Sequence, residues 1–317
     1  MRLNGLYIYQ FQLLFDLKSC LDVFNLRQQA YDQAVLSRIG SFMLETNSAV
    51  MMVIDSNQLE SAKLRAYLSK SPEHYAVLTD YVAMELYKTQ SLHGIFKSME
   101  ILSEFPKQVV VIKNTPYVYR ITGAASEMPM KLIDQSQTGH FTRHIVAMQL
   151  AKAGDTRLQR EILKLGDSSV VQINKMLADA ALLGKSFDDL TKDFTKDERS
   201  QIRNNDIYNP PIFESIIQNV NVIAFNVFKN LAPEVNIESD DDFHSTFIFR
   251  NTLCMYLLAL HWGSVGGAKS ARHEKLRNDV IDTHFATYAT FYDGLLSDDG
   301  KANQIYLKAK KMLEILG

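Results

Sequence analysis

The sequence is poor in cysteine and has no excess of either charge. Its 317 residues include only 2 cysteines, Cys20 and Cys254, which lie far apart in apolar surroundings. This count argues against a disulfide framework and suits a protein of the reducing cytoplasm. Lys and Arg number 34 against 36 Asp and Glu, a net charge of -2. That balance excludes a strongly basic protein that coats nucleic acid, although Lys and Arg could still cluster in a local groove.

Long apolar runs are also missing. No segment reaches the roughly 20 unbroken apolar residues that a membrane-spanning helix needs. The best candidates, LYIYQFQLLF and FRNTLCMYLLALHW, are short and interrupted by polar residues. The N-terminus shows no basic region followed by an apolar core and a cleavage site. We therefore expect a soluble, cytoplasmic protein without a membrane partner.

The sequence does contain enough apolar residues for a sizeable core. Hydrophobic residues make up 46% of the chain, which predicts one large or two medium domains. Residues 1–48 are expected to form an N-terminal helical arm, because apolar residues recur three and four apart without proline. Its aromatic side chains, Tyr7, Tyr9, Phe11 and Phe15, predict packing against the rest of the chain or against a partner.

Between residues 50 and 115, short apolar strands alternate with helices. Strands are expected in AVMMVID, YAVLT and QVVVIK, and a single helix over SLHGIFKSMEILSEF. Asn57 with Glu60 predicts a capping-box start for the first helix, and Thr79 or Asp80 the start of the second. Continuous apolar strands separated by helices are typical of a parallel sheet covered on both faces, a three-layer α/β/α arrangement.

Residues 117–244 lose this alternation and are predicted to form a large helical insertion. Gly154, Gly166 and Gly184 stand where successive helices would have their C-terminal caps. The basic side chains of this segment could form a positive face that holds a phosphate backbone, or they could be the solvated side of amphipathic helices. They are Arg143, Lys152, Arg157, Arg160, Lys164 and Lys175.

The last part of the chain, residues 245–317, returns to a mixed pattern. A strongly apolar and therefore central helix follows SDDDF, whose acidic residues are expected to cap it. A helix is expected over EKLRNDVIDTHFATYATF, a brief strand in DGLLSDD and a terminal helix over KANQIYLKAKKMLEIL.

Carboxylates stand at the ends of two predicted strands. Asp55 ends the first strand, and Asp298 and Asp299 follow the last one. In a parallel sheet, the carboxyl ends of the strands face one edge, where ligands bind. We therefore expect these three carboxylates at the same edge.

Three more carboxylates lie on neighbouring helices. Glu85 is in the helix after the second strand, and Asp279 and Asp282, three residues apart, share one face of the helix before the last strand. Like charges held together repel unless a cation joins them. A cluster of hard oxygen ligands suits Mg²⁺ or Mn²⁺ rather than zinc. Such a site could position a water and stabilise the leaving oxygen in phosphodiester cleavage.

Three segments, VMMVIDSNQLE, VLTDYVAMELYK and RNDVIDTHFATYATFYDGLLSDDGK, carry these acids in a recognisable order. Over about half of the chain, roughly 50–115 and 250–305, they resemble the PIN-domain nuclease superfamily and its PIN-like relatives. The resemblance matches Asp55 with Asn57, Glu85, then Asp279 or Asp282, and finally Ser297 with Asp299 or Asp298. The helical stretch between is a departure from the compact family domain.

The resemblance implies a metal-dependent hydrolase, a nuclease or endonuclease that cleaves RNA and less often DNA. It implies a PIN-like domain of residues 49–116 and 245–317. The acids of the matched motifs would bind Mg²⁺ or Mn²⁺, and Asn57 and Ser297 would support them. Those acids are Asp55, Glu85, Asp279, Asp282 and Asp299, with Asp298 as a further metal ligand. No substrate-binding residue is assigned. A homodimer or a regulatory protein partner is expected from the same resemblance.

Two other classes of protein fit the sequence. A non-catalytic PIN-like scaffold would keep the fold and bind RNA or a protein, although mutually repelling carboxylates would then have no purpose. A helical interaction protein would carry the motifs by accident. In that second class, Asp55 and Asp299 would lie at opposite ends of the structure.

Overall fold

The computed structural model describes residues 49–192, 194–204, 209–237, 239–269 and 271–317. The predicted N-terminal arm, residues 1–48, lies outside the described residues, as does Cys20. Cys254 is a free, buried thiol. No helix within the described ranges is both long and apolar enough to cross a membrane.

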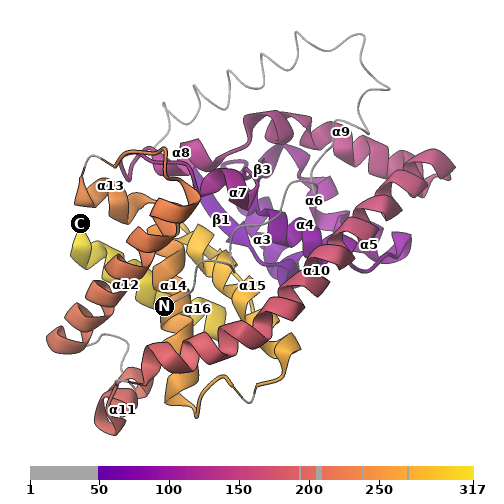
Figure 1. The fold of residues 1–317 in the computed structure, drawn as a ribbon. Coiled ribbons are helices and arrows are strands. Elements are labelled where there is room, and N and C mark those ends of the chain that lie inside the picture. The colour runs from indigo at the N-terminus through magenta and orange to yellow at the C-terminus, as the bar shows by residue number, and fades with distance from the viewer. Residues whose placement is uncertain (1–48, 193, 205–208, 238, 270) are drawn as a thin grey trace.

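The described chain is a mixed α/β structure, mostly helical, with one small sheet of four parallel strands (Figure 1). The strands are β1 (Val50–Ile54), β2 (His74–Leu78), β3 (Val109–Val111) and β4 (Gly294–Leu296). Their order in the sheet is β3-β2-β1-β4. In the centre of the sheet, Val53 pairs with Val77 on one side and with Leu295 on the other. The expected parallel sheet is therefore confirmed.

The described residues also form fourteen α-helices, six of them before residue 133 and eight after it. The first six are α3 (Ala62–Lys70), α4 (Asp80–Tyr87), α5 (Leu92–Ser98), α6 (Glu100–Glu104), α7 (Thr115–Val118) and α8 (Met128–Leu132). The later ones are α9 (Gln135–Lys152), α10 (Thr156–Thr191), α11 (Lys196–Asn204), α12 (Pro210–Leu231), α13 (Asp240–Ser245), α14 (Phe247–Ser264), α15 (His273–Ala289) and α16 (Gly300–Leu316).

The strand order contains a reversal at β1. The chain builds outward from β1 to β2 and then β3, and β4 is added on the other side of β1. Connections that leave in opposite directions from neighbouring strands open a crevice at the carboxyl ends of these strands. The junction of β1 and β4 is therefore where this sheet is expected to bind a ligand.

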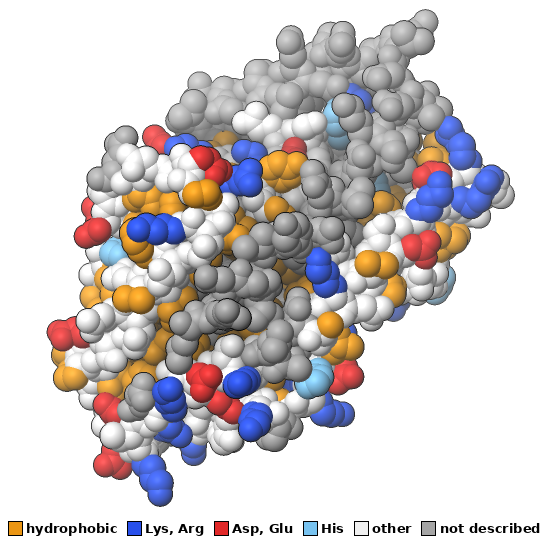
Figure 2. Space-filling view, in the orientation of Figure 1, with side chains coloured by type: hydrophobic (Ala, Val, Ile, Leu, Met, Phe, Trp, Pro, Cys, Tyr) orange, Lys and Arg blue, Asp and Glu red, His pale blue; other side chains and the backbone are white. Residues whose placement is uncertain are grey.

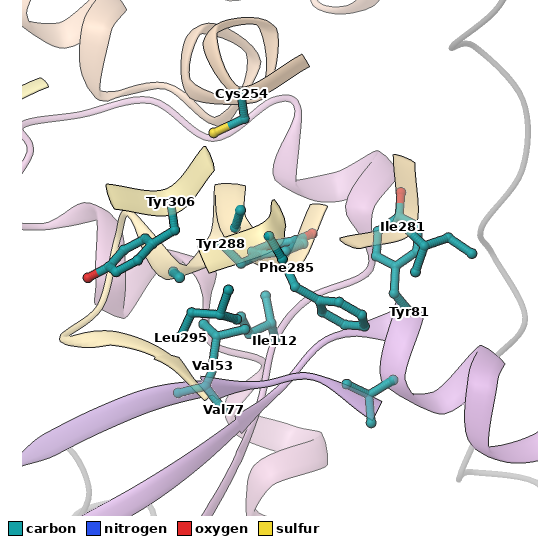
Figure 3. Close-up of a cluster of buried hydrophobic side chains, with 14 of the residues drawn as sticks. Val53, Val77, Tyr81, Ile112, Cys254, Ile281, Phe285, Tyr288, Leu295 and Tyr306 are labelled. Atoms are coloured by element: carbon teal, nitrogen blue, oxygen red, sulfur yellow. The ribbon is translucent and has the colours of Figure 1, made fainter. Parts of the chain in front are cut away.

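Helix α15 packs on the sheet at this junction. Its side chains Phe285 and Tyr288 lie over Val53 and Leu295, whereas Ile281 lies toward Tyr81, and all of these residues are buried (Figure 3). Burial of such side chains contributes roughly 1.5–3 kcal/mol each. The apolar packing thus fixes the helix that carries Asp279 and Asp282 against the strands that precede Asp55 and Asp299.

Helix α14 is the central helix that its apolar sequence predicts. Most of its side chains are buried, including Phe249, Leu253 and Leu258. It packs against α10, α12, α15 and α16.

The acidic cap expected for α14 in SDDDF is wrong, because Thr246 caps α14 by accepting a hydrogen bond from the Phe249 N–H at 3.1 Å. SDDDF instead begins the separate short helix α13, which Ser239 caps by accepting from the Asp242 N–H at 3.1 Å.

The predicted capping box at Asn57 is wrong. Residues Ser56–Gln58 form a short 3₁₀ turn, and the following helix α3 is capped by Ser61, whose hydroxyl accepts from the Lys63 N–H at 3.0 Å. Glu60 accepts a hydrogen bond from the Ser98 hydroxyl at 2.7 Å instead of reaching back along its own segment. A tertiary contact therefore replaces the local cap.

The second helix begins as one of the two expected alternatives. Thr79 is the N-cap of α4, and Asp80 lies in its first turn. The single helix expected over SLHGIFKSMEILSEF is interrupted at Met99, where α5 ends and α6 begins.

The predicted helix ends at Gly166 and Gly184 are also wrong. Gly154 does follow the end of α9 with a positive φ of 113°, but α10 runs without interruption through the other two glycines. At Gly166, an added Cβ would lie 2.9 Å from the Tyr87 carbonyl oxygen, and at Gly184 it would lie 3.1 Å from that of Ala268. These glycines allow close approach of neighbouring segments rather than a turn.

Candidate functional site

The carboxyl ends of β1 and β4 are joined by hydrogen bonds between residues from opposite ends of the sequence. The Asp55 N–H donates to the Leu296 carbonyl at 3.0 Å, which extends the strand pairing to the last residue. The Ser297 hydroxyl then donates to Asp55 Oδ2 at 2.5 Å, and Asn57 Nδ2 donates to the same oxygen at 2.6 Å. Asp55 is thus buried and oriented by donors from both strand ends.

Asp299 belongs to the same group. Its N–H donates to Ser297 Oγ at 2.9 Å, and its Oδ1 accepts from the Ala302 N–H at 2.7 Å as the N-cap of α16. Asp55 and Asp299 are therefore linked through one serine. The arrangement that would have made the motifs accidental, with these two residues at opposite ends of the structure, is not found.

Glu85 reaches the site from α4. The Ser56 hydroxyl is hydrogen-bonded to both Glu85 Oε2 and Asp55 Oδ1, so one serine connects the two carboxylates. The other Glu85 oxygen accepts from Lys88 Nζ at 2.8 Å. Burial raises the pKa of Asp55 and the Glu85 charge raises it further, against the lowering effect of hydrogen bonds from Ser297, Asn57 and Ser56.

Asp282 is the carboxylate whose ionisation is opposed most strongly by its surroundings. In the part of the chain that the structure describes, no hydrogen bond or ion pair reaches its side chain. Burial raises the pKa of Asp282 to about 8, with additional contributions from four other carboxylates. These are Asp55, Asp299, Glu85 and Asp279, in order of decreasing effect. Four carboxylates therefore lie close enough to Asp282 to oppose its ionisation.

The two remaining candidates have partners of their own. Asp279 Oδ2 forms an ion pair with Lys301 Nζ at 2.5 Å and accepts from the Trp262 Nε1–H at 3.0 Å. Asp298 is exposed and forms an ion pair with Lys63 at 2.5 Å. Their charges are already balanced, which sets them apart from Asp282.

The donor set fits a hard divalent cation by its chemistry. All of its atoms are carboxylate, hydroxyl or amide oxygens, the ligands that Mg²⁺ and Mn²⁺ prefer. Burial first, and four neighbouring carboxylates after it, raise the pKa of Asp282, and a cation would offset both effects. As placed, no three carboxylate, histidine or cysteine side chains among the described residues lie close enough together to enclose a metal ion. Side-chain rotation would be needed to bring the oxygens together around one.

The chain matches no protein-family model, no curated protein and no solved structure. The resemblance of its motifs to PIN-domain nucleases therefore stays a prediction.

Sequence reasoning missed two residues that connect the site. Ser56, between Asp55 and Asn57, joins Asp55 to Glu85. Lys301, two residues after Asp299, neutralises Asp279. The signal available in the sequence was that each residue stands one or two positions after an expected metal ligand. Neither contact can be inferred from adjacency alone, because each partner comes from a distant segment.

His284, two residues after Asp282, is a core residue. It is buried, stacks on Tyr81 with ring centroids 4.4 Å apart, and burial lowers its pKa to about 3. The imidazole is therefore neutral at physiological pH.

The basic residues expected to hold a phosphate backbone lie along α9 and α10. Among them, Lys164 is paired with Glu161 at 2.7 Å, and Arg160 Nε donates to the Thr156 carbonyl at 3.3 Å. Figure 2 shows positive and negative side chains interspersed over the face that includes α10. The positive face on these helices stays a prediction.

Proposed function

We propose that the protein is a metal-dependent nuclease with a PIN-like fold that hydrolyses the phosphodiester bonds of RNA. Asp55, Glu85, Asp282 and Asp299 would hold Mg²⁺ or Mn²⁺, and Asn57 and Ser297 would orient Asp55. RNA is preferred to DNA because it is the commoner substrate of the family that the motifs resemble.

The observation that carries this proposal is the environment of Asp282. A buried carboxylate that accepts no hydrogen bond from the described residues and lies near four others is costly to ionise, because burial and the neighbouring charges both disfavour its negative charge. Stability alone gives no reason to assemble such a group at the carboxyl ends of parallel strands. A divalent cation gives one, since it converts the mutual repulsion into attraction.

The strand order supports the same location. Asp55 follows β1 and Asp299 follows β4, so the two carboxylates flank the reversal in strand order. Ligand sites of open parallel sheets lie at this reversal. The order of the acids along the chain also agrees with the PIN-like motifs. The ligand location given by the strand order does not depend on that agreement.

The residues of the site would have different roles in binding and catalysis. Ser297 and Asn57 donate to one oxygen of Asp55 and leave its other oxygen turned toward Ser56 and Glu85. Without a cation, the pKa of Asp282 is about 8; a bound divalent ion would lower it and keep the carboxylate ionised as a ligand. A bound divalent ion would supply a water of lowered pKa and would neutralise charge on the phosphate.

Asp279 and Asp298 are left out of the proposed ligand set. Removing Asp279 from its pair would leave Lys301 half-buried beside Trp262 without its counter-ion. Asp298 is held outward by Lys63. Their proposed roles are to position Lys301 and Lys63 rather than to bind metal.

The test compares the full chain with its Asp55→Asn and Asp282→Asn variants on labelled single-stranded RNA and DNA, with Mn²⁺, Mg²⁺ or EDTA. We expect cleavage that requires metal and falls by at least about 100-fold in both variants. Glu314→Gln, a change of the same size at an exposed position of α16, should cleave like the unmodified protein.

Metal binding by calorimetry separates the possible failures. Absence of both cleavage and Mn²⁺ binding would exclude the proposed function. Metal-independent binding of RNA without cleavage would favour the non-catalytic scaffold. Circular dichroism of each variant checks that a loss of cleavage does not come from a loss of folding.

A further inference from the structure

A buried glutamine, Gln58, lies close to the carboxylates. It ends the 3₁₀ turn that follows Asp55, and its side chain is fully buried, whereas that of its neighbour Asn57 is exposed. Its Oε1 has no hydrogen-bond partner among the described residues. A buried amide oxygen without a partner is costly, and an apolar side chain of similar size would avoid that cost. Any contribution of the Gln58 amide must therefore come from its nitrogen.

The Gln58 nitrogen donates to the side chain that holds Asp55. Gln58 Nε2 lies 2.7 Å from Asn57 Oδ1, and Asn57 Nδ2 donates in turn to Asp55 Oδ2 at 2.6 Å. The same carboxylate oxygen accepts from the Ser297 hydroxyl. Two amides in series thus connect a buried side chain to a carboxylate of the site.

The orientation of the Asn57 amide decides whether it attracts or repels Asp55. Its Nδ2 faces the carboxylate, and its Oδ1 accepts from Gln58 Nε2 and from the Asp298 N–H at 3.3 Å. A main-chain N–H can only donate, so the Asn57 oxygen belongs on that side. After rotation by half a turn, the amide would place its oxygen against the Asp55 carboxylate and its nitrogen against two donors.

The exposed side chain of Asn57 needs a second donor to keep this orientation. Water competes for an exposed amide, and the bond from the Asp298 N–H is long. The Gln58 bond is shorter and comes from a turn that packs against α4. A donor already fixed by packing orients its partner without a further loss of its own side-chain freedom.

The Gln58 amide also reaches the segment that follows β4. Lys63 lowers the pKa of Asp298, and a hydrogen bond from Gln58 lowers it further. Gln58 therefore contacts the residues that follow both β1 and β4, the two strands whose carboxyl ends carry the site.

We propose that Gln58 is a positioning residue of the carboxylate site. Its buried amide fixes the Asn57 amide in the orientation that donates to Asp55. The Asp55 carboxylate is thereby held with Oδ2 toward Ser297 and Oδ1 toward Ser56. This orientation is a property of the metal-free protein, whereas its consequence for metal binding rests on the proposed nuclease function.

The first experiment observes the Asn57 side-chain amide by nuclear magnetic resonance, with the full chain in EDTA so that no metal contributes. Gln58→Met removes the amide and keeps an unbranched side chain of similar size. We expect the Asn57 Nδ2 proton resonances to shift toward those of a solvated asparagine and to exchange faster with water, because the amide is no longer fixed. Unchanged Asn57 resonances in this variant would overturn the proposal.

Gln137→Met is the matched control. Gln137 also has a buried Oε1 without a partner among the described residues, and its Nε2 donates to Asp134 at 3.2 Å. The substitution removes the same chemical group from the start of α9 and should leave the Asn57 resonances in place. A shift of equal size in both variants would count against the proposal, because Asn57 would then respond to any change of packing.

A second variant covers the case in which Gln58→Met does not fold. Asn57 is exposed, so Asn57→Ala removes the acceptor of Gln58 without opening the core. The Gln58 side-chain amide resonances should then shift in turn. If they do not respond, Gln58 is not bonded to Asn57 and the proposal is wrong.

Mn²⁺ binding measured by calorimetry connects the orientation with the proposed function. Gln58→Met should weaken Mn²⁺ binding about tenfold, the lower end of the effect of residues that orient metal ligands. In an Asn57→Ala background, the same change should weaken it less than about twofold, because Gln58 acts through Asn57. Equal weakening in the two backgrounds, or none in either, would contradict the positioning role.

Failure of the proposed function gives a different pattern. If the unmodified protein binds no Mn²⁺, the nuclease proposal fails, and the amide resonances still decide the role of Gln58. Shifted Asn57 resonances would then support Gln58 as the residue that orients Asp55, and unshifted resonances would overturn that role as well.

Discussion

At the scale of single residues, Asp282 stands in surroundings that oppose its ionisation. Its pKa is raised from 3.8 to about 8, first by burial and then by the charges of Asp55, Asp299, Glu85 and Asp279. The folded protein therefore retains a proton on Asp282 over a pH range in which the unfolded chain has already released it. Stability decreases as the pH rises through this range, because the unfolded state then binds fewer protons than the folded one.

The first prediction concerns Asp282→Asn in EDTA. The amide cannot ionise, so the variant should be more stable than the unmodified protein at pH 8 and about equally stable at pH 4. We expect a gain on the order of 2–4 °C in Tm at pH 8 for each kcal/mol of repulsion removed. Thermal unfolding at several pH values measures it. Mn²⁺ should raise the Tm of the unmodified protein and leave that of the variant nearly unchanged. A pH-independent difference between the two would show that repulsion is not the cause.

Ser297 carries a second prediction at this scale. Its hydroxyl donates to Asp55 and accepts from the Asp299 N–H, so Ser297→Ala removes the link between two proposed ligands. Loss of hydrogen bonds to a charged group costs about 1–3 kcal/mol, which denaturant unfolding would measure. Mn²⁺ affinity should fall about 10–100-fold, as it does when a residue that orients a metal ligand is removed.

Ser103→Ala is the control for Ser297. The Ser103 hydroxyl donates to the Glu100 carbonyl at 2.6 Å at the surface, and its loss should change the stability by less than about 0.5 kcal/mol. If both variants lost the same stability and bound Mn²⁺ equally, Ser297 would have no special part in orienting Asp55.

At the scale of elements, α10 depends on its glycines for packing rather than for termination. Helix α10 packs against α4, α14 and α15, and Gly166 brings its backbone close to the Tyr87 carbonyl. Glycine in a helix interior normally lowers stability by roughly 0.5–1 kcal/mol relative to alanine. Close contact with the neighbouring segment offsets that cost.

Gly166→Ala should therefore destabilise the protein although alanine favours a helix. The new methyl would lie 2.9 Å from the Tyr87 carbonyl oxygen, a backbone atom that cannot turn aside. Overpacking of this kind costs typically 1–3 kcal/mol. Gly300→Ala is the matched control, because nothing lies within 4 Å of its added Cβ at the start of α16. It should be neutral or stabilising by up to about 1 kcal/mol. Chemical denaturation of both variants compares the two, and the same sign for both would contradict this role.

At the scale of the whole molecule, the helices of residues 117–244 share their core with the sheet region. The buried side chains form one continuous hydrophobic cluster, which includes Val53 of β1, Phe187 of α10 and Phe228 of α12. Helix α10 contacts both α4 and α15, the helices that carry Glu85 and Asp282. Packing of the helical segment therefore bears on the position of the carboxylates.

This shared core predicts a single cooperative unfolding transition. Phe187 is buried, and Phe187→Ala should cost about 3–5 kcal/mol while unfolding of the sheet and of the helices remains coincident. Calorimetry combined with near-ultraviolet dichroism would show one transition at a lower temperature. Two separate transitions, only one of them shifted, would mean that the helical segment folds as a unit of its own.

Much of the arrangement around β1 to β3 follows from local pattern. Short apolar runs rich in β-branched residues, such as QVVVIK, predict buried parallel strands because alternation with helices leaves both sheet faces covered. Asp55 is placed at the sheet edge by the same pattern, since it is the first charged residue after an apolar strand. These properties depend on neighbours in the sequence, and the sequence by itself determined them.

The tertiary structure alone decided what each carboxylate faces. The pairing of β4 with β1 brings Ser297 to Asp55 across 242 positions of the chain, and Lys301 neutralises Asp279 but not Asp282. The same holds for Gly166, because its contribution to stability depends on a carbonyl of α4 rather than on its own helix. Charge, burial and close contact are set by distances between segments that sequence pattern does not contain. For that reason the acids could be named from the sequence, whereas only the fold shows which of them lie beside a neutralising cation.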